Sequence, residues 1–211
     1  VIQFLDESGK LCLDTSLRLG TQRFEADEDG EIHLPYSNES SLETILLESG
    51  PRVAVQKLWH MQERYTLALG VHVENEAMVA GALAPLLLRT ELSVNGFPAH
   101  LSLLEEPVLT LRATDVHGIE STSDIHDLEL SSDAEFLHEF RVPEDLASLQ
   151  VSLRGTVKNL SKGEDVQLRA GASAFQVNAI DRTRGTDCPI LGRDQHGYFV
   201  DVLGKNGEPL L

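Results

Sequence analysis

The stretch Asp27-Glu28-Asp29-Gly30-Glu31 places four carboxylates around one glycine. Carboxylate oxygens around a sharp glycine turn are ligands that calcium accepts. We therefore take Asp27, Asp29 and Glu31 as candidate metal ligands. The stretch lacks the spaced Asp/Asn pattern and the distal Glu of a twelve-residue calcium loop, so a solvated Asp-x-x-Gly turn is the simpler interpretation. The prediction is no resident metal or cofactor, with calcium at this turn as the alternative. The acidic residues Asp124, Asp127 and Glu129 allow the same two interpretations.

The sequence contains none of the common catalytic motifs that we searched for. The motifs G-x-S-x-G, G-x-x-x-x-G-K-[ST] and H-E-x-x-H do not occur. Eight histidines are present, but a metal site needs two or three of them to converge with carboxylates. His138 shares the apolar parity of Phe136 and Phe140, which favours a core or edge histidine over a ligand. The sequence therefore predicts that the chain is not an enzyme.

Charge and hydropathy restrict the partners. The formal net charge of −17 argues against nucleic acid and anionic membranes, because both recruit clustered Lys and Arg. No run of 18 apolar residues is present, so we expect no insertion into a membrane. Protein partners, or neighbouring domains of the same chain, remain as the expected contacts. Trp59 and Phe97 are possible anchors for a partner, although the parity of Trp59 with Val53 and Val55 favours a place in the core.

The elements that position these residues follow a period of two. Apolar residues alternate over 65–73 and again over 86–94, ending at Asn95-Gly96. Alternation at period two is typical of a strand with one buried face and one wet face. We expect these two strands to pair at the centre of a sandwich. Residues 44–48 are apolar for too few positions to form a stable helix, so we expect a strand there, whereas the polar residues 120–127 indicate a loop.

Strands and turn signals continue along most of the chain. The segments around Asp27–Gly30 and Asp6–Lys10 match Asp-x-x-Gly turns, and the first of these predicts a hairpin between its flanking strands. Alternation with polar outer faces argues against a parallel α/β sheet. The predicted fold class is all-β, with two tandem antiparallel β-sandwich modules. We place a small module at 1–63, a larger one at 64–203, and the start of a following module or a linker at 204–211.

Certain motifs resemble known sandwich families. Leu86–Arg89, Asn95-Gly96-Phe97-Pro98, Phe140–Pro143 and the closing Gly-Lys-Asn-Gly-Glu-Pro are similar to macroglobulin-type modules of large alpha-2-macroglobulin-like multidomain proteins. The turn and strand from Ala26 to Pro35 resemble small prealbumin-like or Ig-like repeats. The reactive Cys-Gly-x-Gln motif of macroglobulins is absent, since Cys12 and Cys188 are followed by Leu and Pro. The resemblance therefore assigns no functional residue.

These observations predict a non-catalytic structural and interaction segment of a larger protein. The resemblance implies an extracellular, periplasmic or cell-surface location. The natural contact surfaces would be the loops around 115–127 and 160–171. Two alternatives stay open: a calcium- or carbohydrate-dependent binding module, and an accessory domain of a hydrolase or protease whose catalytic domain lies elsewhere.

Overall fold

The structure, a computed structural model, describes residues 1–171, 174–176, 188–203 and 209. The chain divides into two compact units. The first comprises Val1–Arg64 with Asn159–Glu164, and the second comprises Tyr65–Lys158 with Asp165–Leu211. Most of the segment 204–211, where we expect a following module or a linker, lies outside the described residues. Antiparallel strands account for nearly all of the regular structure, which confirms the predicted all-β fold class.

The first unit has two sheets around a small core. A four-stranded sheet has the order β3-β2-β5-β6, and β1 pairs with β4 in a second sheet. Leu17, Ile32 and Ile45 are buried between the sheets, and Ile2 and Phe4 pack against them. The strands are β1 (Ile2–Gln3), β2 (Ser16–Leu19), β3 (Gln22–Glu25), β4 (Glu31–Ile32), β5 (Ser41–Ser49) and β6 (Arg52–His60).

Two expectations for this unit have different outcomes. Residues 44–48 lie within β5, as predicted. The hairpin expected at Asp27–Gly30 is wrong, because β3 pairs with β2 whereas β4 pairs with β1. The turn itself forms, with the Gly30 N–H donating to the Asp27 carbonyl at 3.0 Å. Turn chemistry thus fixes the reversal of the chain but not the strand that each flank joins.

Glu63 attaches residues 159–164 to the rest of the first unit. Its carboxylate accepts the backbone N–H groups of Leu160 at 3.2 Å and Ser161 at 2.7 Å. The Asn159 side chain donates to the Glu63 carbonyl at 3.0 Å. Glu63 is only 7% exposed, so these hydrogen bonds satisfy a carboxylate that is removed from water.

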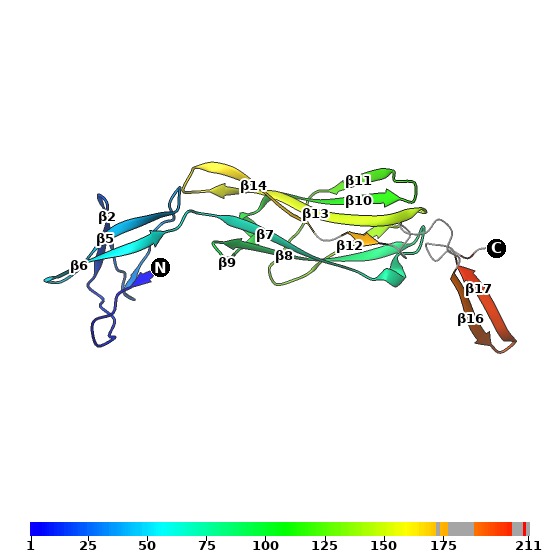
Figure 1. Ribbon diagram of the computed structural model, residues 1–211, viewed down its shortest axis with the longest axis horizontal. Helices are drawn as coiled ribbons and strands as arrows, with labels where there is room; N and C mark the ends of the chain where they lie inside the picture. Colours follow the sequence, from blue (N-terminus) through cyan, green and yellow to red (C-terminus); the bar gives the residue numbers. More distant parts are fainter. Residues whose placement is uncertain (172–173, 177–187, 204–208, 210–211) are drawn as a thin grey trace. The chain divides into compact units, whose positions relative to one another are not determined.

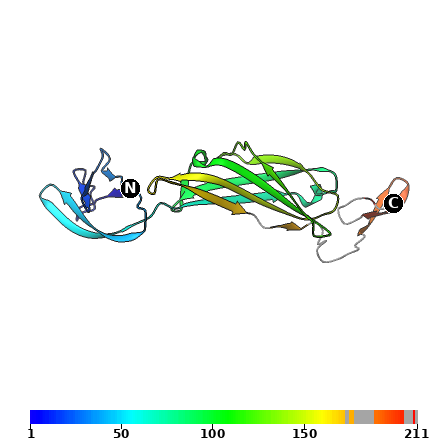
Figure 2. The same cartoon turned by 90° about the horizontal axis from the view of Figure 1, so that it is seen from above.

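The second unit is a sandwich of two sheets (Figure 1). One sheet has the order β11-β10-β13-β14, with β15 also on β13, and the other has the order β12-β8-β7, with β9 on β8. Figure 2 shows the long strands of this unit running side by side. Its elements are β7 (Tyr65–Val73), η1 (Asn75–Ala77), β8 (Leu83–Val94), β9 (Phe97–Ala99), η2 (Leu101–Leu103), β10 (Glu105–Asp115), β11 (Glu120–Ile125), β12 (Phe136–Arg141), β13 (Leu146–Asn159), β14 (Glu164–Gly171), β15 (Phe175–Gln176), β16 (Cys188–Asp194) and β17 (Gly197–Leu203). The last two strands form a two-stranded sheet of their own.

The opening pair of the second unit forms as predicted. Tyr65 lies opposite Val94 and Leu67 opposite Leu92, and Leu67 and Leu92 are buried in the core between the sheets. Asn95 and Gly96 both have positive φ, as a tight hairpin turn requires. The pair is not central, however, because among the described strands β7 lies at the edge of the order β12-β8-β7.

The loop expected at 120–127 is also wrong for most of its length. Glu120–Ile125 forms β11, which pairs with β10 over six residues from Thr114–Glu120 to Leu109–Ile125. Five of its six side chains are exposed, so the sequence lacks the alternation of apolar and polar residues that would predict a strand. The backbone ladder with β10 outweighs low strand propensity at an edge position.

Candidate functional site

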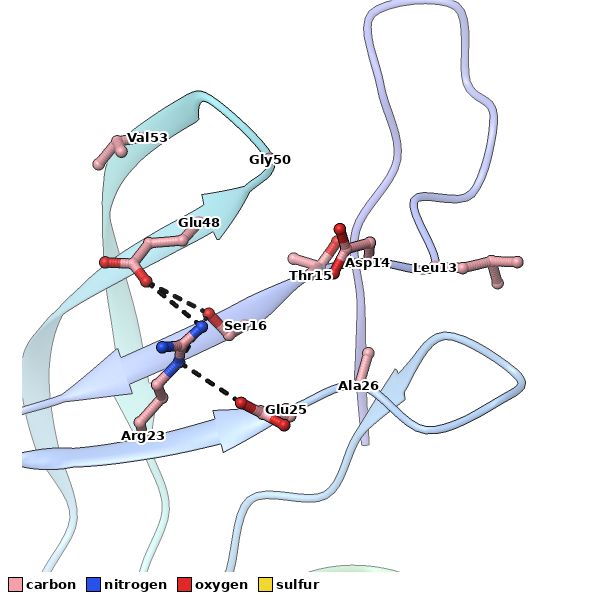
Figure 3. A pocket seen from close by; sticks show the side chains of 10 residues that line it. All are labelled: Leu13, Asp14, Thr15, Ser16, Arg23, Glu25, Ala26, Glu48, Gly50 and Val53. Carbon is pink, nitrogen blue, oxygen red and sulfur yellow. Dashed lines mark hydrogen bonds and ion pairs between the residues drawn. The ribbon is translucent and has the colours of Figure 1, made fainter.

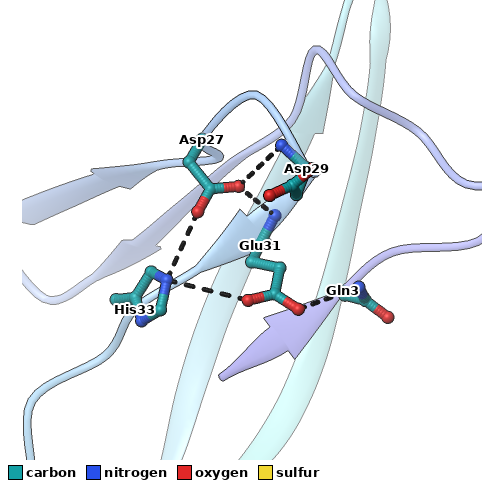
Figure 4. Close-up of polar contacts among 5 residues, drawn as sticks. All are labelled: Gln3, Asp27, Asp29, Glu31 and His33. Carbon is teal, nitrogen blue, oxygen red and sulfur yellow. Dashed lines mark hydrogen bonds and ion pairs between the residues drawn. The ribbon is translucent and has the colours of Figure 1, made fainter.

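The acidic turn of the first unit brings two of the three predicted ligands together. Asp27 and Glu31 lie beside His33, and their potential ligand atoms all fall within 4.8 Å of one another (Figure 4). His33 Nε2 lies 3.3 Å from Asp27 Oδ2 and 3.8 Å from Glu31 Oε2. Asp29 contributes its backbone N–H to Asp27 Oδ1 and does not join the group. Sequence reasoning missed His33, although its i+2 spacing from Glu31 on an extended segment was the signal for it.

Much of the hydrogen-bonding capacity of this cluster is already used. Asp27 Oδ1 accepts N–H groups from Asp29 at 3.0 Å and Glu31 at 2.9 Å. The hydrogen bond from the Glu31 N–H is the main cause that holds the pKa of Asp27 below its ordinary value. A calcium ion takes six to eight oxygen ligands, whereas this cluster brings together two carboxylates and an imidazole. The geometry describes an Asp-x-x-Gly turn with a neighbouring histidine.

The outer face of the first unit's larger sheet exposes an apolar surface. Its members, which we call the β6 surface, are between 58% and 65% exposed: Leu42, Val53, Val55 and Trp59. Leu42 lies directly opposite Trp59 in the ladder between β5 and β6, so the two side chains share one face. The expectation that Trp59 belongs to the core is therefore wrong. Parity correctly grouped Trp59 with Val53 and Val55, but it could not show which face the core would cover.

Among the strands that the structure describes, β6 pairs only with β5, so its other edge has no strand beside it. It is the last strand in the order β3-β2-β5-β6, and it extends over nine residues. A long edge strand with exposed apolar side chains offers N–H and C=O groups to the backbone of another chain. Lys57, whose ammonium donates to the Thr44 hydroxyl at 2.6 Å, contributes a charge to the same face. The unpaired edge and its exposed apolar side chains are typical of a surface that accepts a partner by strand addition, whereas a lysine on an edge strand opposes it.

A polar cavity of about 530 Å³ opens at one end of this face (Figure 3). Val53, a member of the β6 surface, lines it together with Arg23 and Glu48. The guanidinium of Arg23 lies 3.8 Å from the Glu48 carboxylate and donates to the Ser16 hydroxyl at 3.2 Å. Charged groups that already pair with one another border the apolar surface, an arrangement that resembles the polar rim of a protein interface.

Of the second acidic stretch, only Asp124 lies on a strand, whereas Asp127 and Glu129 follow that strand and lie outside any strand. Asp124 lies on β11, where its carboxylate accepts the Thr110 hydroxyl at 2.6 Å and pairs with Arg154 at 2.9 Å. These contacts, the Thr110 hydroxyl first, hold the pKa of Asp124 below its ordinary value. Most of the two expected contact loops is strand, namely β11 and β14. Phe97 is 63% exposed at the start of β9, consistent with its place among the possible anchors.

The described residues contain no helix that is long and apolar enough to cross a membrane.

Two comparisons place the chain among known proteins. The family model of the AbpF third immunoglobulin-like domain matches residues 74–183, which is more than half of the chain. Actin-binding protein F of Dictyostelium discoideum is 27% identical over 222 residues, covering 99% of this chain. The chain spans only 9% of the length of that relative. These matches support an Ig-like structural and interaction module of a larger protein.

The comparisons also change two earlier expectations. The Ig-like part of the predicted resemblance is confirmed, whereas the macroglobulin part is not. The expected extracellular, periplasmic or cell-surface location is wrong, because the relative is named for binding actin, a protein of the cell interior. That expectation came from the macroglobulin resemblance and from no residue of the chain. By its match over 74–183, the chain belongs to the family of the AbpF third immunoglobulin-like domain.

Proposed function

We propose that this chain is a non-catalytic structural and interaction segment of a larger protein, and that it holds a protein partner on the β6 surface. The observation that carries the proposal is the coincidence of four exposed apolar side chains with an unpaired edge strand. A partner strand added to β6 would gain backbone hydrogen bonds from the edge. Its side chains would cover Val53, Val55 and Trp59, and tryptophan is among the residues that most often dominate binding energy at interfaces.

Filamentous actin is the first partner to test, because the relative is named for binding it. The chain itself is strongly acidic, so its contact with any acidic partner must rest on apolar burial and backbone hydrogen bonds more than on charge. The β6 surface meets this requirement, since its four members are apolar, although Lys57, Arg18 and Arg23 lie on the same face of the sheet.

Co-sedimentation with actin filaments tests the proposal. We expect the unmodified chain to pellet with filaments, and Trp59→Ala and Val55→Glu each to weaken binding roughly tenfold or more, as loss of an interface anchor does. Leu137→Ala is the matched control, because Leu137 is 58% exposed, close to the 59% of Trp59, and lies in the second unit. Equal pelleting of all these variants, or absence of the unmodified chain from the pellet, would contradict binding of actin through β6.

Hydrogen exchange adds a readout that reports the mode of binding. Strand addition should slow exchange of those backbone N–H groups of β6 that point away from β5, and leave the strands of the second unit unchanged. Slower exchange spread over both units would instead indicate a contact that does not use the β6 edge.

A further inference from the structure

The end of the chain repeats a feature found at its beginning. Leu5 forms an isolated antiparallel bridge with Leu11, and Leu203 forms one with Pro209. The second pair lies 198 positions after the first at both residues (203 − 5 and 209 − 11). At the same offset, Gly207 and Leu211 stand at the positions of Gly9 and Leu13. The two segments therefore share a bridge, its spacing and the types of several residues.

The strand before each bridge shows the same alternation. Ile2 and Phe4 pack against the core of the first unit, and Gln3 between them is exposed. The offset of 198 places Val200 and Val202 at the positions of Ile2 and Phe4, and the exposed Asp201 at that of Gln3. The apolar parity that fills a core at the start of the chain is thus present again in β17.

Among the residues that the structure describes, Val200 on this parity is exposed, whereas Val202 is half-buried. Val200 is 58% exposed, and Leu191, which lies opposite it on β16, is 68% exposed. Tyr198, on the same face, is 73% exposed and is contacted by the Arg193 guanidinium 5.3 Å from its ring centre. The strands β16 and β17 form a sheet of two, and a lone hairpin is marginally stable in water. By contrast, β1 pairs with β4, and Ile2 and Phe4 are partly buried against the core of the first unit.

We propose that β17 is the first strand of a further copy of the first unit on the same polypeptide. In that copy, Val200 and Val202 enter the core in the manner of Ile2 and Phe4. The edge of β17 that faces away from β16 pairs with a strand equivalent to β4. The partner is therefore a segment with the sequence character of residues 14–64, and the pair of units recurs along the protein every 198 residues. This inference goes beyond the contact proposed for β6 and does not depend on it.

A chain lengthened by a second copy of residues 14–171, placed directly after Leu211, tests the inference, because residues 159–164 of that copy supply the hydrogen-bond partners of its Glu63 carboxylate. The offset makes this join continuous with the repeat, since Leu211 stands at the position of Leu13. Hydrogen exchange followed by mass spectrometry would compare residues 14–64 of the added copy with the original residues 14–64 in the same molecule. We expect residues 14–64 of the added copy to reach at least a tenth of the protection of the original, and β17 to become more protected than in the unextended chain.

Two variants of the lengthened chain identify the strand responsible. Replacing both Val200 and Val202 with Asp should reduce protection of residues 14–64 of the added copy at least tenfold, while the original copy stays unchanged. Asp201→Ser is the matched control, because its counterpart Gln3 is exposed, and it should have no such effect. The inference is overturned if residues 14–64 of the added copy exchange as an unfolded chain, or if they stay protected in the Val200/Val202 variant. Absence of protection in the original copy would also overturn it, because the template for the repeat would then not fold.

Discussion

Leu17→Ala provides the sharpest test of the first unit as an independent fold. Leu17 is fully buried, and the first unit has only two other buried apolar residues, Ile32 and Ile45. Truncation of a buried leucine to alanine costs about 2–5 kcal/mol, because it removes apolar contacts and leaves a cavity. The first unit holds 70 residues, 64 plus 6. At about 0.05–0.15 kcal/mol per residue, its free energy of unfolding is roughly 4–10 kcal/mol. The substitution therefore removes a large share of that stability.

The chain carries its own reporter for this experiment. Trp59 is the single tryptophan and lies in the first unit, so its fluorescence follows the unfolding of that unit alone. At an m-value of about 1–2 kcal/mol/M in urea, a loss of ~3 kcal/mol lowers the midpoint by roughly 2 M. Far-ultraviolet circular dichroism, which reports both units, should then show the transition of the second unit at an unchanged urea concentration.

Leu42→Ala is the matched control, because it makes the same chemical change at a side chain that is 58% exposed. We expect it to cost less than about 1 kcal/mol, chiefly through its cross-strand contact with Trp59. Equal midpoints for Leu17→Ala and Leu42→Ala would refute the assignment of Leu17 to a core and of Leu42 to an open surface.

Three further outcomes follow from particular contacts. Asp27 should titrate below its ordinary pKa of 3.8 by carbon-detected NMR. Because its folded pKa is lowered, its contribution to stability is present above the unfolded pKa and is lost as pH falls through the folded value; a titration midpoint at or above 3.8 would contradict this. Calcium should leave the urea midpoint of the first unit unchanged, since the cluster of Asp27 and Glu31 offers fewer oxygens than the ion requires. A rise of the midpoint that EDTA reverses would show that the first unit binds calcium. Gly155→Ala should lower the free energy of unfolding of the second unit by about 1–3 kcal/mol, because a Cβ there would lie 2.7 Å from the Leu104 side chain and 3.2 Å from the Glu105 carbonyl. Circular dichroism during urea unfolding measures this change, and an unchanged midpoint would contradict the close approach.

Part of the candidate site can be predicted from the residue types and their spacing. The Asp27–Gly30 turn forms with the backbone hydrogen bonds that its sequence predicts, because an aspartate carboxylate reaches N–H groups two and four residues ahead whatever surrounds it. His33 joins that turn through its spacing along an extended segment. The partner of each flanking strand, however, depends on which sheet it enters, and the pairing of β4 with β1 lies outside any local signal.

The β6 surface also combines a feature that the sequence predicts with one that only the tertiary structure determines. Alternation placed Val53, Val55 and Trp59 on one side of a strand, and the structure keeps them there. Their exposure follows from the opposite face of the sheet, where Leu17 and Ile45 meet the strands β1 and β4. Parity divides side chains into two sets but does not say which set the rest of the chain will cover.

The sequence by itself determined the local rules of this protein: strands of period two, turns at Asp-x-x-Gly and Asn-Gly, and an acidic chain with an all-β fold. These features depend on residues within a few positions of one another, where backbone geometry and side-chain hydrogen bonds act directly. Only the tertiary structure decided that polar residues 120–125 form an edge strand, that β7 lies at an edge, and that Trp59 faces outward. Those outcomes depend on which strands meet across long stretches of chain, because pairing and burial are set by the neighbour that each face acquires on folding.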